Sequence, residues 1–134
     1  MGNRRRGREH VLKALYAFEL GDQTREEVID TILLNGGLDE ATLEFSKKLF
    51  IKTIDSLEHI DGRIEQLATN WKIDRIAIVD KNILRMAICE VDFMPDIPIK
   101  VAINEAIELA KKYSTLESAS FVNGILDHVL QSNA

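Results

Sequence analysis

The chain has 134 residues, 46% of them hydrophobic and 29% charged, and it carries a formal net charge of −5 at pH 7. This size fits one domain over residues 1–134, and no apolar run approaches the ~18 residues needed to cross a bilayer, so we expect a soluble protein without membrane contact. The N-terminus lacks the uninterrupted apolar stretch of a secretory signal, and the single cysteine, Cys89, cannot form an internal disulfide, which together indicate the cytoplasm.

Helical periodicity runs through the whole sequence, with apolar residues recurring at spacings of three and four and no sustained alternation. It predicts an all-α fold, a compact bundle of six or seven helices. The first helix is expected over residues 3–20. A short second helix follows the capping box of Thr24 and Glu27, and the Asn-Gly-Gly run at 35–37 ends it by favouring left-handed conformations.

The middle of the chain predicts two longer helices with a short one between them. Asp39 caps the first of these, which continues to Asn70, with a break near Gly62 as an alternative. A short helix is expected after Asp74, and the second long helix is expected from Asp80.

Two prolines and a second capping box organise the C-terminal third. Pro95 and Pro98 interrupt the helical pattern, because proline suits a first helical turn but not a helix interior. Another helix follows them, and the last one opens at a capping box of Ser114 and Glu117. Its periodicity continues through the Asn-Gly pair at 123–124, so we predict helix there in place of a hairpin turn.

Four of the 17 basic residues stand at the start of the first predicted helix, at Arg4, Arg5, Arg6 and Arg8. Acidic side chains are preferred there, because the helix dipole places partial positive charge at the N-terminus. A basic patch on an otherwise acidic chain commonly binds a polyanion. Arg4 and Arg8 lie one turn apart with Arg5 adjacent, which suits neighbouring phosphates, and a solvated tail that only aids solubility is the alternative.

The sequence shows no pattern typical of catalysis, of a cofactor site or of a metal centre, so we expect no enzyme activity. The three histidines are scattered, and no Glu-x-x-His pair or glycine-rich phosphate loop occurs. Asp55 and His59 share one face of a helix, where an exposed ion pair is favoured over a pair of metal ligands. Cys89 falls among apolar helical residues, which indicates a buried, unreactive thiol.

Two residues far from the N-terminus each leave two interpretations open. Phe121 fits the apolar stripe of the last helix, and a platform on which a nucleobase stacks is the alternative. Arg85 lies off the apolar face of its helix, where a surface ion pair, for example with Glu90, is the simpler interpretation.

Three stretches together resemble the NusB family of bacterial transcription antitermination factors, namely RRRGREHVLKALYAFEL, RIAIVDKNILRMAICE and DIPIKVAINEAIELAKKYSTLESASFVNGILD. The resemblance covers essentially the full chain, and IP-x-KVAINEAIELAK followed by FVNGILD is its most specific part. It implies a protein of two packed helical subdomains that binds the boxA segment of nascent RNA. It also implies a partner, ribosomal protein S10, also called NusE, with which the protein helps RNA polymerase pass terminators in ribosomal RNA operons.

The same resemblance implies roles for individual residues. Those that match the RNA-binding positions of the family are Arg4, Arg5, Arg8, Arg85 and Phe121. Those that match positions meeting S10 are Tyr16, Asp74 and Asp80. The family usually has glutamate at the position of Asp80, and tryptophan is frequent at that of Phe18. No catalytic residue, cofactor or metal is implied.

Two other functions stay open at the level of sequence. The same helical module occurs as the N-terminal domain of RNA cytosine methyltransferases, but no Gly-rich cofactor-binding unit follows Leu130, so we expect no such enzyme here. A helical adaptor that binds proteins and no nucleic acid is the other alternative. Whether the free protein is a monomer, or a homodimer that buries its arginine helix, is left open as well.

Overall fold

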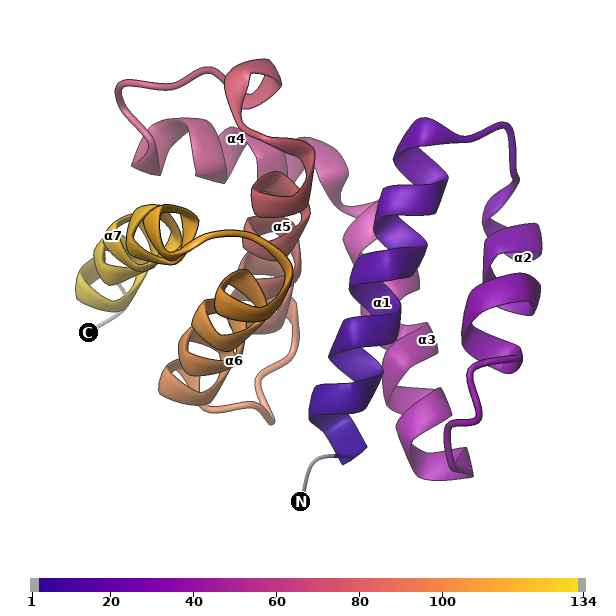
Figure 1. Cartoon of the computed structure of the whole chain (residues 1–134). Helices are drawn as coiled ribbons and strands as arrows, with labels where there is room; N and C mark the ends of the chain where they lie inside the picture. The colour runs from indigo at the N-terminus through magenta and orange to yellow at the C-terminus, as the bar shows by residue number, and fades with distance from the viewer. Residues whose placement is uncertain (1–2, 133–134) are drawn as a thin grey trace. The chain divides into compact units, whose positions relative to one another are not determined.

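A computed structural model describes residues 3–132, and within that range the chain forms seven α-helices, a π-helical turn and a 3₁₀ turn, with no strand. The all-α prediction is therefore confirmed. The helices divide into two compact units, the first ending at Asp55 and the second beginning at Ser56 (Figure 1). Two helical units are also what the resemblance implied.

The first unit contains three α-helices, of which α1 and α3 pack closely along each other (Figure 1). Its elements are α1 (Asn3–Leu20), α2 (Arg25–Val28), the π-helical turn η1 (Ile29–Leu34) and α3 (Glu40–Asp55). Gly7 makes the close packing possible, because a Cβ atom there would lie only 2.5 Å from the Ser46 hydroxyl on α3. Phe18 of α1 meets Phe50 of α3 edge to face, with ring centroids 6.3 Å apart.

Local capping starts both later helices of this unit as the sequence predicted. The Thr24 hydroxyl accepts from the Glu27 N–H at 3.2 Å, and the Glu27 carboxylate accepts from the Thr24 N–H at 2.8 Å. Asp39 accepts from the Thr42 N–H at 2.8 Å, and this hydrogen bond lowers the pKa of Asp39. Of the predicted left-handed run, the structure places only Gly37 at positive φ, at +70°.

The long helix predicted from Asp39 to Asn70 is divided, and the predicted break was misplaced. The helix ends at Asp55, Ser56 adopts φ −117° and ψ 20°, and α4 (Leu57–Leu67) runs straight through Gly62. The Thr53 hydroxyl donates to the Leu49 carbonyl at 2.7 Å in the last turn of α3, a contact that often bends helices. The break therefore falls at the boundary of the units, not at the glycine.

The second unit is built around α5, in which every side chain from Asn82 to Glu90 is buried. Its elements are α4, the 3₁₀ turn η2 (Ile73–Arg75), α5 (Ile78–Phe93), α6 (Ile99–Tyr113) and α7 (Leu116–Ser132). Helix α6 packs on both α5 and α7 (Figure 1). Cys89 is fully buried, as predicted.

The ends of α6 and α7 confirm the proline prediction and correct the last cap. Pro98 is the residue that precedes the first turn of α6. The cap of α7 is Thr115, whose hydroxyl accepts from the Ser118 N–H at 3.0 Å, whereas the predicted cap, Ser114, closes α6 by donating its N–H to the Ala110 carbonyl. Helix α7 continues through the Asn-Gly pair at 123–124, as predicted.

Candidate nucleic-acid interface

The N-terminal arginines differ in exposure. Arg4, Arg5 and Arg6 are exposed on the first turns of α1, whereas Arg8 is only 3% exposed. The guanidinium carbons of Arg4 and Arg8 lie 4.6 Å and 5.1 Å from the ring centroid of Phe45 on α3. The predicted open face of Arg4 with Arg8 therefore needs correction, since Arg8 is buried while Arg4 and Arg5 reach solvent.

Arg6 has a structural role within its own unit that the sequence analysis did not predict. Its guanidinium donates to the carbonyl of Gly36 at 3.0 Å and to the carbonyl of Gly37 at 3.3 Å. These carbonyls follow the end of η1, where backbone acceptors lack helical partners. One of the four clustered arginines thus closes the loop between η1 and α3.

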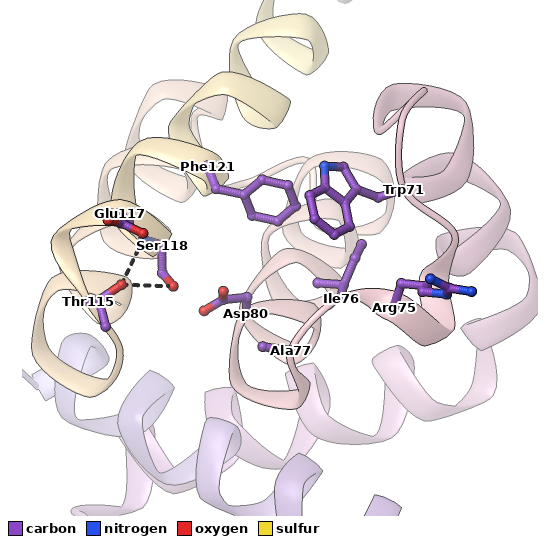
Figure 2. A pocket seen from close by; sticks show the side chains of 9 residues that line it. All are labelled: Trp71, Arg75, Ile76, Ala77, Asp80, Thr115, Glu117, Ser118 and Phe121. Carbon is purple, nitrogen blue, oxygen red and sulfur yellow. Dashed lines mark hydrogen bonds between the residues drawn. The ribbon is translucent and has the colours of Figure 1, made fainter.

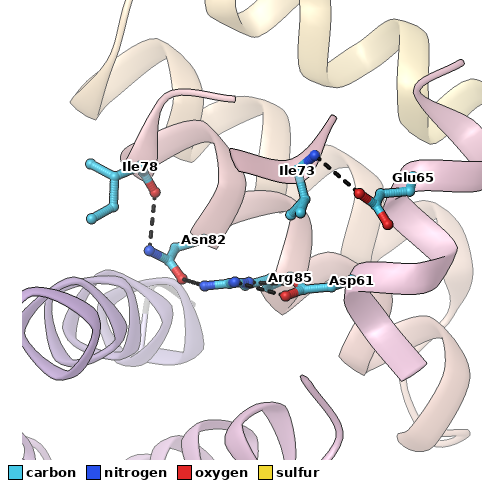
Figure 3. Close-up of polar contacts among 6 residues, drawn as sticks. All are labelled: Asp61, Glu65, Ile73, Ile78, Asn82 and Arg85. Atoms are coloured by element: carbon cyan, nitrogen blue, oxygen red, sulfur yellow. Dashed lines mark hydrogen bonds and ion pairs between the residues drawn. The ribbon is translucent and has the colours of Figure 1, made fainter. Parts of the chain in front are cut away.

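Arg85 is held by a buried ion pair, shown in Figure 3. Its Nε and Nη2 atoms donate to the two oxygens of Asp61 on α4, each at 2.8 Å. Its Nη1 atom donates to the Asn82 amide oxygen at 3.1 Å, and the Asn82 amide nitrogen donates to the Ile78 carbonyl at 3.0 Å. The side chain is 11% exposed, so the expected surface ion pair is in fact a buried, bidentate one with Asp61.

Phe121 lies in the second unit, where its ring contacts that of Trp71. Figure 2 shows the two rings pointing toward each other, Phe121 from α7 and Trp71 from the segment that precedes η2. Their centroids are 6.0 Å apart and their planes lie at 77°. Phe121 is half-buried and Trp71 is 51% exposed, so this pair offers aromatic surface to solvent.

Two hollows flank the aromatic pair, and each ring lines both of them. The first, called here the Asp80 hollow, has a volume of about 330 Å³ and includes Arg75, Asp80, Glu117 and Ser118 in its wall (Figure 2). The second, called the Gly124 hollow, has a volume of about 320 Å³, and its lining includes Asn70, Ser120, Gly124 and His128. Two acidic side chains thus line the first hollow, whereas no Asp, Glu, Lys or Arg of the described residues lines the second.

Asp80 is 6% exposed, and its Oδ1 atom has no hydrogen-bond partner among residues 3–132. A buried carboxylate oxygen without a donor is costly, and most such groups in native proteins are satisfied. Asp80 also lines the first hollow, although this oxygen atom itself is buried.

The remaining residues predicted to meet S10 are exposed. Tyr16 is 40% exposed on α1, and Asp74 is exposed on η2. Of all the predicted site residues, the structure brings Phe121 and Asp80 together at one hollow. Sequence reasoning missed Trp71 and Asp61, since helical periodicity signals neither the exposure of a ring nor a pairing across helices.

The predicted pair of Asp55 and His59 does not form. Asp55 pairs with Arg25, and His59 lies 2.9 Å from an Asp92 oxygen that also binds Arg63 at 2.8 Å. In the part of the chain that the structure describes, no group of three or more His, Cys, Asp or Glu could hold a metal ion. None of the described helices has the length and apolar character that a bilayer crossing requires.

Comparisons with known proteins cover nearly the whole chain. The model of the NusB family matches residues 5–131. The transcription antitermination protein NusB of Salinibacter ruber is 44% identical, over 97% of this chain and 82% of that protein.

Solved structures agree in fold. T. maritima NusB superposes with a TM-score of 0.88 at 40% identity, covering 96% of this chain and 90% of that one. The antitermination factor NusB in a crystal structure with NusE and double-stranded RNA superposes with a TM-score of 0.89 at 26% identity, over 98% of each chain. By sequence over almost its full length, the chain belongs to the NusB family.

Proposed function

We propose that the chain is a transcription antitermination factor that binds boxA RNA together with ribosomal protein S10 (NusE). It would act in the cytoplasm, within the RNA polymerase antitermination complex and without catalysing a reaction. The observation that carries this proposal is the family match over residues 5–131, with relatives that are themselves antitermination proteins.

For RNA, we assign the direct contacts to Arg4, Arg5 and Phe121. The two arginines are exposed and the ring lines both hollows, which suits single-stranded RNA, because its phosphates bind cations and its unpaired bases stack on aromatics. Arg8 and Arg85 are assigned supporting roles. Arg8 packs over the Phe45 ring, which Arg4 also contacts. Arg85 links α5 to α4 through its ion pair with Asp61.

For S10, we assign the contacts to Tyr16, Asp74 and Asp80. The net charge of −5 leaves the chain acidic outside its arginine cluster, so a basic partner is attracted to it while RNA stays on the arginines. A basic side chain of S10 in the Asp80 hollow would meet the carboxylates of Asp80 and Glu117 that line it.

The test is the affinity of the full chain for labelled boxA RNA, measured by fluorescence anisotropy with and without S10. We expect the chain to bind boxA RNA more tightly in the presence of S10. A scrambled RNA of equal length and composition should bind more weakly than boxA RNA. An Asp80→Asn variant should lose part of the gain from S10 while its affinity for RNA alone is kept. Binding of S10 without any gain in RNA affinity would instead favour a protein adaptor.

A further inference from the structure

We propose that the Gly124 hollow receives one unpaired nucleobase, with Trp71 as a stacking residue for it beside Phe121. The inference rests on the proposed function, since it names where a base of the bound RNA would sit. It adds a residue, Trp71, and a pocket that neither the sequence pattern nor the comparisons assign.

Trp71 has the exposure and setting of a binding residue. Half of its surface reaches solvent, while its ring is held edge to face against Phe121 at 6.0 Å. Its backbone is fixed as well, because its N–H donates to the Ala68 carbonyl at 2.9 Å. A ring held in place from one side loses little conformational freedom when a base stacks on it.

Packing within the described residues does not explain why position 124 is a glycine. It lies in the interior of α7, between the buried residues Val122 and Ile125, where glycine is less favourable than alanine. A Cβ atom built at Gly124 would have no neighbour within 4 Å, so packing among residues 3–132 does not require a glycine here. Its position in the wall of the hollow supplies a reason, because a bare helix backbone leaves room for an incoming group.

The lining distinguishes the two hollows chemically. The Gly124 hollow combines the two rings with Asn70, Ser120 and His128, which offer hydrogen bonds to the edge of an uncharged planar group. The Asp80 hollow shares the two rings but adds two acids and one cation, Arg75, and this net negative charge suits a cationic side chain. A base therefore fits the Gly124 hollow better than the Asp80 hollow.

Cations stand next to Trp71 for the adjoining phosphates. Lys72 and Arg75 are exposed on the same short segment, and Arg75 lies in the wall of the neighbouring hollow. A base stacked at Trp71 would thus have a positive charge close to its own backbone.

The single tryptophan makes the test direct, because emission excited at wavelengths that the two tyrosines do not absorb comes from Trp71. Titration of the full chain with boxA RNA should quench this emission in parallel with the anisotropy signal, since a stacked base quenches indole. S10 alone, whose basic side chain would enter the Asp80 hollow that Trp71 also lines, should change the emission less than RNA does. Quenching by S10 that RNA does not increase would overturn the proposal and assign the hollow to the protein partner.

Variants provide the second arm of the test. Trp71→Leu should weaken RNA binding roughly 5- to 150-fold, the usual range for one base–aromatic stack, and Trp71→Phe should retain much of the affinity. Leu34→Ala is the matched control, because Leu34 is a similarly exposed apolar residue, at 48%, and lines neither hollow.

A second set of variants tests the pocket itself. Gly124→Leu should fill the hollow and weaken RNA binding, whereas Gly62→Leu, at an equally open helical glycine outside it, should not. RNA binding without quenching, and equal in the wild type, Trp71→Leu and Gly124→Leu, would overturn this inference and leave the proposed function standing. Failure of the wild type to bind RNA at all would overturn both.

Discussion

Trp71 and Phe121 meet edge to face at 6.0 Å, and this one contact forms part of the wall of two hollows that differ in the charge of their other lining residues. The residues come from different elements, one from the segment before η2 and the other from α7. The Asp80 hollow adds Arg75, Asp80 and Glu117 to the pair, whereas the Gly124 hollow adds polar residues that include His128. Under the proposed function, the Asp80 hollow would receive a basic side chain of S10 and the Gly124 hollow a nucleobase.

The ion pair of Arg85 with Asp61 predicts a stability effect that an RNA contact alone would not produce. Asp61→Leu should destabilise the protein by about 3 kcal/mol, near the lower end for a broken buried pair, because Asp61 is partly exposed. Urea unfolding measures the loss. The double variant Arg85→Met with Asp61→Leu should recover part of it, and a double variant no better than the single one would contradict the pairing.

Arg6 and Arg4 predict opposite outcomes from the same substitution. Arg6→Gln removes the hydrogen bonds to the Gly36 and Gly37 carbonyls and should cost about 1 kcal/mol of stability. Arg4→Gln should leave stability within about 0.5 kcal/mol and weaken RNA binding. Thermal unfolding and RNA anisotropy on both variants separate the roles, and equal losses of stability would remove the distinction.

The helical glycines predict a gain in stability. Gly124→Ala and Gly62→Ala each place a Cβ atom in open space within a helix, so each should stabilise the fold by about 0.5 to 1 kcal/mol. Gly7→Ala should instead destabilise it, because the new Cβ atom would lie 2.5 Å from the Ser46 hydroxyl. Calorimetry on the three variants provides the comparison, and a stabilising Gly7→Ala would contradict the close packing of α1 on α3.

Because Asp39 caps α3, we expect its titration to account for part of the loss of folding stability at low pH. The Thr42 N–H lowers the pKa of Asp39 in the folded state, so the ionised carboxylate stabilises the fold above its unfolded pKa near 4. This contribution is lost as the pH falls through that value toward the lower folded pKa. Asp39→Asn keeps the acceptor without titrating, so it should lose less stability than the wild type between neutral pH and about pH 3. Parallel urea curves at both pH values test this.

The sequence predicted what depends on neighbours along the chain. The caps at Thr24 and Asp39 involve partners three residues away, and the helical course through Gly124 follows from periodicity. The features that the sequence did not predict depend on contacts between helices. The break at Ser56, the burial of Arg8, and the pairing of Arg85 with Asp61 are set by segments distant in the sequence, which composition and spacing do not reveal.

The most direct test of the central claim is the salt dependence of boxA RNA binding. If three or four phosphates are neutralised, log affinity should fall with log salt at a slope of about −2 to −3, using about −0.7 per contact for single strands. The double variant Arg4→Gln with Arg5→Gln should show a slope shallower by about 1.4, with its fold confirmed by thermal unfolding. A wild-type affinity that does not respond to salt, or an unchanged slope in the double variant, would contradict binding of RNA by the exposed start of α1.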